Sequence, residues 1–149
     1  MFKKNLNNNA AFGEMYYENI GWIAKNKLLF ALWGKSFPVE IIVLSESKSI
    51  SVNSDQENTY EYILFSIDQI RFDVEETILN HIQNENSESL SNRYQPTQLI
   101  IEQNGSYGIC FDDIFFPDCA DYPETGFVIR FSVEIEFYDS QSKYLAMVL

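Results

Sequence analysis

The strongest constraint on the fold is a stretch near the C-terminal end in which apolar and polar residues alternate. The apolar members are Phe127, Ile129, Phe131, Val133, Ile135 and Phe137. The residues between them include Arg130, Ser132, Glu134 and Glu136. Because successive side chains of a strand point to opposite faces, this stretch predicts a strand with one apolar face and one polar face. Such a strand is typical of an antiparallel sheet that is covered on a single side.

The same two-residue period recurs in the first third of the chain. Its apolar sets are Met15 and Tyr17; Trp22 and Ala24; Leu28, Phe30 and Leu32; and Val39, Ile41 and Val43. Further along, Asn104-Gly105 separates two alternating segments and is a strong hairpin signal. Residues 144–149 are predicted to form a last strand that pairs back across a turn at 139–143. These patterns favour short antiparallel strands joined by tight turns.

Two helices are predicted between these groups of strands. Ser54 is the expected N-cap of the first helix, and Glu57 stands in the capping-box position. A second helix is expected from about Asp73, and residues 84–92 are expected to form a polar loop. The order of strands, helices and strands argues against a parallel βαβ unit. The sequence therefore predicts an α+β fold in which a mostly antiparallel curved sheet carries two helices packed on one face.

The chain's length and composition predict one globular domain. A chain of 149 residues with 46% hydrophobic residues can bury a sizeable core. We expect residues 1–11 to form a flexible N-terminal arm and residues 12–149 to form a single α+β domain. No apolar run approaches the roughly 20 residues that span a bilayer, and the start lacks the apolar segment of a secretory signal, so a cytoplasmic location is expected.

The content of metal-binding residues predicts neither a metal centre nor a cofactor. Cys110 and Cys119 are the only cysteines, and His81 is the only histidine. A pair of cysteines does not complete a tetrahedral zinc site, so zinc is not expected. The sequence also contains neither a nucleophile elbow nor a glycine-rich phosphate loop. His81 lies on the apolar side of the second predicted helix, and we interpret it as a packed structural histidine.

The net charge of −12 is unevenly distributed along the chain. Through Ile50, six lysines outnumber four acids, whereas beyond it 18 acids face four bases, a net charge of −14. Such a field repels nucleic acid and anionic membranes. It attracts a basic protein, with an association that weakens as salt rises. Solubility alone also accounts for an acidic composition.

The segment 110–124 is the richest candidate site, because it combines five acids and several aromatic residues without a base. We interpret it as a protein-docking loop, a composition suited to interface anchors. Its predicted partner-binding residues are Asp112, Asp113, Phe115, Phe116, Asp118, Asp121, Tyr122 and Glu124. Two alternatives stay open: a connecting loop whose phenylalanines plug the end of the sheet, and a metal or catalytic site at Asp121 and Glu124. The acid spacing does not match an EF-hand loop.

The order of several short motifs resembles a group of small bacterial domains that includes immunity proteins of polymorphic-toxin loci. The motifs are Trp33-Gly34, Gln56 with Tyr60, Asn104-Gly105 with Tyr107-Gly108-Ile109, and Asp121 with Glu124-Thr125-Gly126. Thr125 stands where the group's pattern has histidine, and Asp121 is one residue farther from Glu124 than in that pattern. The resemblance implies a protein that binds and blocks a toxin.

Three functions are therefore considered. The first is an immunity protein that neutralises a bacterial toxin domain through an acidic and aromatic surface. The second is a small hydrolase that uses Asp121 and Glu124, with or without a divalent metal. The third is a structural domain that hides its aromatic loop by self-association.

Overall fold

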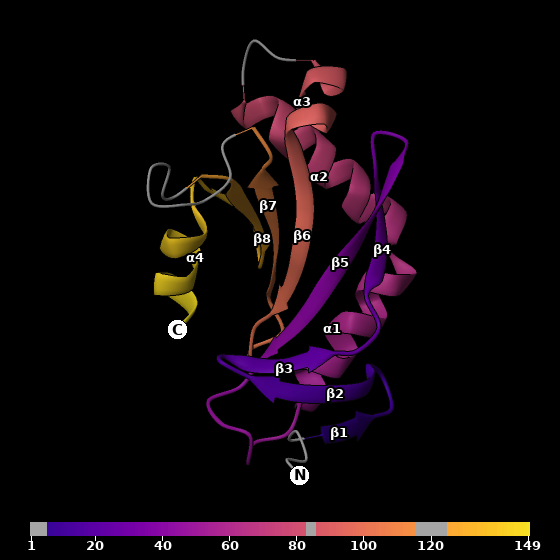
Figure 1. The fold of residues 1–149 in the computed structure, drawn as a ribbon, viewed down its shortest axis with the longest axis vertical. Coiled ribbons are helices and arrows are strands. Elements are labelled where there is room, and N and C mark those ends of the chain that lie inside the picture. The colour runs from indigo at the N-terminus through magenta and orange to yellow at the C-terminus, as the bar shows by residue number, and fades with distance from the viewer. Residues whose placement is uncertain (1–5, 83–85, 116–124) are drawn as a thin grey trace.

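The protein folds into a twisted sheet with helices on both faces (Figure 1). The computed structural model describes residues 6–82, 86–115 and 125–149. The strands are β1 (Leu6–Asn9), β2 (Gly13–Glu18), β3 (Gly21–Ala24), β4 (Leu28–Leu32), β5 (Lys35–Leu44), β6 (Tyr94–Ile101), β7 (Tyr107–Asp113), β8 (Phe127–Phe131) and β9 (Ile135–Tyr138). The helices are α1 (Ser54–Phe65), α2 (Ile67–His81), α3 (Ser87–Arg93) and α4 (Gln141–Val148). No described helix is long and apolar enough to cross a membrane.

The strand order confirms an α+β fold with a mostly antiparallel sheet. The order is β1-β2-β3-β5-β6-β7-β8-β9, and β4 also pairs with β5. One pair is parallel: β5 and β6 run side by side from Glu40 opposite Gln98 to Val43 opposite Ile101. The expectation of no parallel βαβ unit is therefore wrong, since the segment with α1, α2 and α3 is the crossover between these strands. The consecutive apolar residues at 41–44 and 99–101 are typical of central parallel strands buried on both faces.

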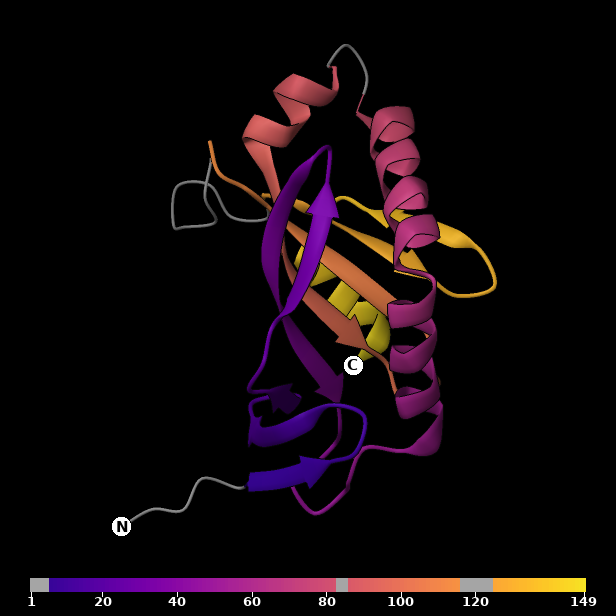
Figure 2. The same ribbon diagram turned by 90° about the vertical axis from the view of Figure 1, so that its right-hand side faces the viewer.

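Both faces of the sheet carry a hydrophobic cluster. On one face, Ile63 of α1 and Ile70, Val74 and Ile78 of α2 join the odd-numbered apolar residues of the central strands. On the other face, Tyr144 of α4 packs with even-numbered residues of the same strands, such as Ile42 and Ile100. Figure 2 shows α1 and α2 running almost end to end along the sheet, with α4 on its far side. The expectation that a single side is covered is therefore wrong.

The alternating stretch 127–137 is a hairpin and not one strand. Phe131 pairs with Ile135, and Ile129 pairs with Phe137, so odd-numbered residues stay on one face through the turn. Val133 lies at the turn and is fully exposed. Because this pairing keeps the odd-numbered residues on one face, apolar and polar residues alternate in the sequence without a break at the turn.

Three other segments also differ from the sequence-based expectation. Residues 141–148 form helix α4, since Ser140 caps it by accepting a hydrogen bond from the Lys143 amide at 3.2 Å. Residues 87–92 of the predicted polar loop belong to helix α3, whose Leu90 is buried. Residues 6–9 of the predicted arm form β1, which pairs with β2.

Helix α1 begins with a capping box that also joins the two parallel strands. The cap is Asn53, one residue before the expected Ser54, and Gln56 takes the position expected for Glu57. The buried Gln56 side chain accepts a hydrogen bond from the Asn53 amide at 3.0 Å and donates to the Leu44 carbonyl at 2.9 Å and the Ile101 carbonyl at 3.5 Å. These carbonyls stand at the C-terminal ends of β5 and β6. Gln56 thus fixes the start of the crossover helix to the centre of the sheet.

Replacement of Gln56 by leucine is expected to lower the free energy of unfolding by about 1–3 kcal/mol, because it leaves buried backbone groups without their partner. The matched control is Gln69→Leu in α2, whose exposed amide bonds only Asp73 and whose loss should change stability by less than about 0.5 kcal/mol. Urea unfolding followed by circular dichroism measures both. Equal effects of the two substitutions would contradict this role of Gln56.

The buried thiol of Cys110 makes stability fall at alkaline pH. Burial, assisted by the charge of Asp112, raises the pKa of Cys110 from about 9 to about 12. The unfolded chain therefore ionises this thiol first as pH rises, and the folded state loses up to about 4 kcal/mol between pH 9 and 12. In Cys110→Ala, the decline of unfolding free energy over this range should be shallower. Parallel pH profiles of the two proteins would rule out this contribution.

Candidate functional site

The acidic and aromatic segment predicted as a docking loop is described only up to Phe115. Phe116, Asp118, Asp121, Tyr122 and Glu124 lie outside the described residues. The three remaining predicted residues, Asp112, Asp113 and Phe115, stand at the end of β7 and just after it.

Asp113 is buried and belongs to the fold's own contacts. Its carboxylate receives hydrogen bonds from Arg93 Nε at 3.2 Å and from an Arg93 terminal nitrogen at 3.0 Å. It also accepts a hydrogen bond from the Phe115 amide at 3.1 Å. Since the carboxylate is turned inward and compensated, Asp113 fixes the start of the segment and adds little to the surface field.

Asp112 and Phe115, in contrast, lie at the surface. Asp112 is exposed, and Oδ1 of its carboxylate accepts a hydrogen bond from the Gln141 amide of α4 at 3.2 Å. Phe115 has 60% of its surface exposed, with the Arg93 guanidinium 5.9 Å from its ring centroid. These two residues keep the character expected of a docking segment, an acid beside an exposed aromatic ring.

The described residues do not assemble a catalytic or metal-binding group. Within 6–82, 86–115 and 125–149, no three His, Cys, Asp or Glu side chains gather in a metal-binding arrangement. The His81 ring stacks on Phe137 with centroids 4.4 Å apart, and its Nδ1 lies 2.9 Å from the Thr77 carbonyl oxygen. This histidine is therefore held by contacts within α2 and with β9.

A partly buried ion-pair network is centred on Arg130 of β8. Arg130 donates to both carboxylate oxygens of Glu102 at 2.8 Å, and a third nitrogen contacts Glu136 at 3.2 Å. The hydroxyl of Tyr144 donates to Glu102 at 2.9 Å, and that of Tyr138 donates to Glu136 at 2.7 Å. The guanidinium is thus paired with two carboxylates, each of which also accepts a tyrosine hydroxyl.

The contacts of the network shift the pKa values of several of its members. The hydrogen bond with Glu102 is the largest cause of a raised Arg130 pKa, and hydrogen bonds from Tyr138 and Arg130 lower the pKa of Glu136. Burial and the charge of Glu102 raise the pKa of Tyr144 far above its ordinary value. These shifts move the pKa values of Arg130, Glu136 and Tyr144 away from neutral pH.

A glycine makes room for this network. A Cβ atom at Gly108 would lie 2.7 Å from the Tyr144 ring, so any other residue at this position would displace the tyrosine. Tyr144 is fully buried over β7, and its hydroxyl reaches Glu102. Gly108 therefore lets α4 pack closely on the sheet and complete the network.

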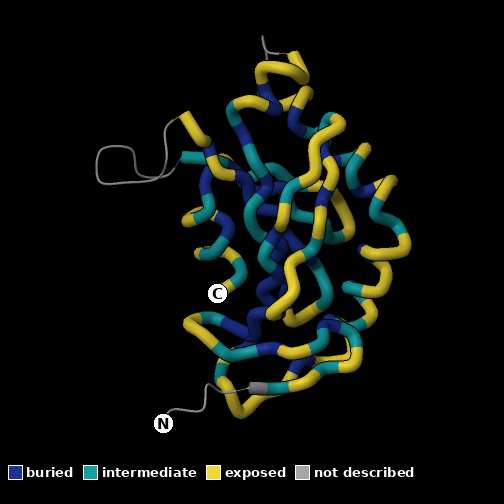
Figure 3. The backbone as a smooth tube through the Cα atoms, turned by 45° about the vertical axis from the view of Figure 1, so that its right-hand side comes forward, coloured by how far each residue is buried: buried dark blue, intermediate teal, exposed yellow. Residues whose placement is uncertain are grey.

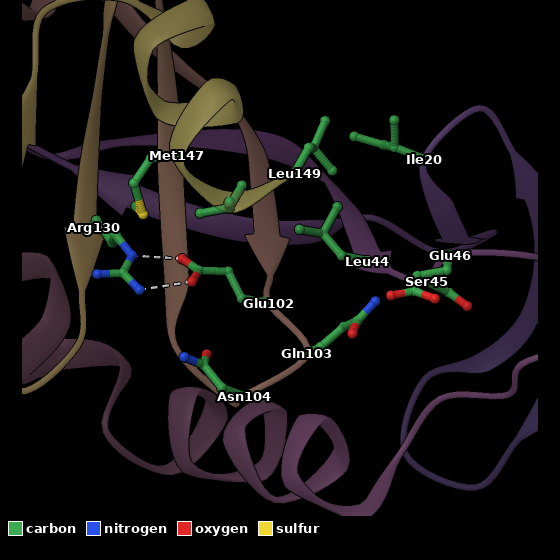
Figure 4. Close-up of a pocket in the computed structure, with 11 residues that line it drawn as sticks. Ile20, Leu44, Ser45, Glu46, Glu102, Gln103, Asn104, Arg130, Met147 and Leu149 are labelled. Atoms are coloured by element: carbon green, nitrogen blue, oxygen red, sulfur yellow. Dashed lines mark hydrogen bonds and ion pairs between the residues drawn. The ribbon is translucent and has the colours of Figure 1, made fainter.

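A pocket of about 380 Å³ opens beside the ion pair (Figure 4). Arg130 and Glu102 form part of its wall, and Met147 and Leu149 from the C-terminal end of the chain form another part. The arginine faces the glutamate and is compensated by it, so the pocket offers no uncompensated positive charge to an anionic ligand. The polar groups here hold α4 against the sheet.

The outer side of α1 and α2 carries a row of exposed apolar residues that sequence reasoning missed. Phe65, Phe72 and Leu79 have 92%, 56% and 44% of their surfaces exposed. We call these three residues the helical stripe. Figure 3 shows exposed positions along the outer side of both helices. The seven-residue spacing of the stripe is visible in the sequence, but the helical pattern of the buried residues on the same helices is stronger.

No family model, curated protein or solved structure matches this chain.

Replacement of Arg130 by methionine is expected to lower the free energy of unfolding by about 3–5 kcal/mol, since it strands the buried carboxylate of Glu102. The control is Lys25→Met, which breaks an exposed ion pair with Glu14 and should cost less than about 1 kcal/mol. Chemical denaturation at neutral pH compares the two variants. A loss of less than 1 kcal/mol in Arg130→Met would show that the network does not stabilise the fold.

Proposed function

We propose that this chain acts by binding and not by catalysis, as an immunity-type protein that covers the active surface of a basic toxin domain. The proposal joins the resemblance of its motifs to bacterial immunity proteins with the charge of its surface. Of the three described members of the predicted docking segment, Asp112 and Phe115 lie at the surface where a partner can contact them, and Asp113 is buried.

The observation that carries the proposal is the way the chain uses its basic residues. Beyond Ile50 it has only four, and three of them form ion pairs with acids of the same chain. These pairs are Arg93 with Asp113, Arg130 with Glu102 and Glu136, and Lys143 with Asp139. With the bases occupied in this way, the remaining acids of this region dominate the field that an approaching protein meets.

Much of that surplus lies on α1 and α2. Residues 54–81 contain seven acids and one arginine, a net charge of −6. Between described residues, no acid of these helices forms an ion pair. A basic partner is therefore drawn to this side of the molecule.

Binding of this kind explains inhibition without chemistry. Acids accelerate the encounter with a basic surface, and exposed aromatic residues slow dissociation once the surfaces meet. A toxin whose substrate is an anionic polymer needs a basic groove, and a protein with an acidic face competes for that groove.

The test begins with a pull-down of the tagged protein from its native cells to isolate the toxin-like domain that it binds. Coexpression and binding kinetics of the purified pair follow. We expect rescue of growth and a complex whose association rate falls steeply with salt. The variant E61Q/D68N/E76Q should reduce the association rate about tenfold at low salt. The control E14Q/E18Q/E46Q removes the same number of charges from the first third of the chain and should change the rate much less.

Absence of a complex at low salt between the two folded proteins would overturn the proposal. An association rate equally sensitive to both charge variants would show that net charge acts without a preferred face.

A further inference from the structure

We infer that the helical stripe on α1 and α2 is the docking surface for a basic amphipathic helix of the partner protein. This inference rests on the proposed function and names the kind of element that the acidic side of the molecule receives.

The first support is the geometry of the stripe. Phe72 and Leu79 lie seven residues apart on α2, so they differ by only about 20° around its axis. Phe65 is the last residue of α1, and Ser66 separates it from α2. Phe72 lies opposite the buried side of α2. It is two residues from both Ile70 and Val74, and a separation of two residues rotates a side chain by about 200° around the helix axis.

The stripe leaves much of its apolar surface exposed in the isolated domain. Phe65 has 92% of its surface exposed, so its ring gains little from burial in this fold. Single exposed apolar residues are ordinary, but these three large ones lie on two helices that run almost end to end. A second helix laid along α1 and α2 would cover such a row with its own apolar face.

The second support is a row of acids with the same spacing. Glu61, Asp68 and Glu75 each stand four residues before a member of the stripe, so they form a parallel acidic edge beside it. Glu75 also accepts a hydrogen bond from the Trp33 amide at 2.7 Å, which fixes its end of the edge. Acids beside an apolar seam select a partner helix with lysine or arginine at the facing positions.

Charge decides which occupant fits. A second copy of this chain would bring the −6 of its own residues 54–81 against the same charge, so self-pairing of the stripe is disfavoured. A basic helix neutralises the acidic edge and covers the three apolar side chains at the same time. The occupant is therefore a basic amphipathic helix, bound along α1 and α2.

The test uses a synthetic three-heptad peptide with leucine at its two seam positions and lysine or arginine at the flanking positions. A control peptide of the same composition has its leucines scattered around the helix. We expect the amphipathic peptide to bind about tenfold more tightly than the scattered one, because only it presents an apolar seam. Calorimetry at two salt concentrations measures both.

Two matched variants test the surface. F65S/F72S/L79S removes the stripe and should weaken binding of the amphipathic peptide about tenfold. L29S/I114S/V133S removes three exposed apolar side chains on other elements and should leave binding within about twofold. Circular dichroism melts confirm that both variants fold.

Equal binding of the two peptides, or equal binding of the two variants, would overturn the inference. Sedimentation of the free protein gives a further check: a dimer that F65S/F72S/L79S dissociates would assign the stripe to a second copy.

The natural complex separates this inference from the proposed function. If the toxin-like domain binds the stripe variant as well as the wild type, helix docking fails while the immunity function stands. If the toxin-like domain does not bind the wild type, the proposed function fails whatever the peptide does.

Discussion

The parallel pairing of β5 with β6 is the constraint on which the rest of the structure depends. Parallel neighbours need a long crossover, and here α1, α2 and α3 provide it. Gln56 closes the arrangement, since its buried amide reaches the carbonyl ends of both strands from the first turn of α1. The crossover must then run along one face of the sheet, which presents one side of α1 and α2 to the core and leaves the opposite side exposed (Figure 2).

The sequence predicts most strands and both long helices, because their residues follow a two-residue or a helical period. It does not predict the parallel pair or the β8–β9 turn, for different reasons. The parallel pair depends on which strands become neighbours, and local periodicity carries no such information. The turn leaves no signal in the sequence, because Phe131 pairs with Ile135 and the alternation of apolar and polar residues continues through it. The sequence predicts a strand where α4 forms, because the residues of α4 are mostly apolar. The hydrogen bond from Tyr144 to Glu102 of the sheet, which holds α4, joins residues far apart in the sequence.

At the candidate site, the sequence predicts the charge but not which charged side chains are exposed. The acidic surplus beyond Ile50 is countable in the sequence, but which acids remain uncompensated depends on the fold. Asp113 belongs to the predicted docking segment, yet it is buried against Arg93, whereas Asp112 beside it is exposed. Adjacent strand residues point to opposite faces, so one step along β7 separates a structural carboxylate from a surface one. The helical stripe was missed because the buried face of the same helices has a stronger apolar pattern.

The distribution of polar contacts explains how the domain tolerates an unfavourable surface. Seven acids within residues 54–81 repel one another, and an exposed Phe65 contributes almost nothing to the core. Among the described residues, none of these acids forms an ion pair, while the Arg130 network and Gln56 hold the sheet from its two faces. The acids and the exposed Phe65 do not stabilise the fold, so another explanation is needed for their presence on these helices. A basic helical partner supplies one, since it would neutralise the acids and bury the stripe in a single contact.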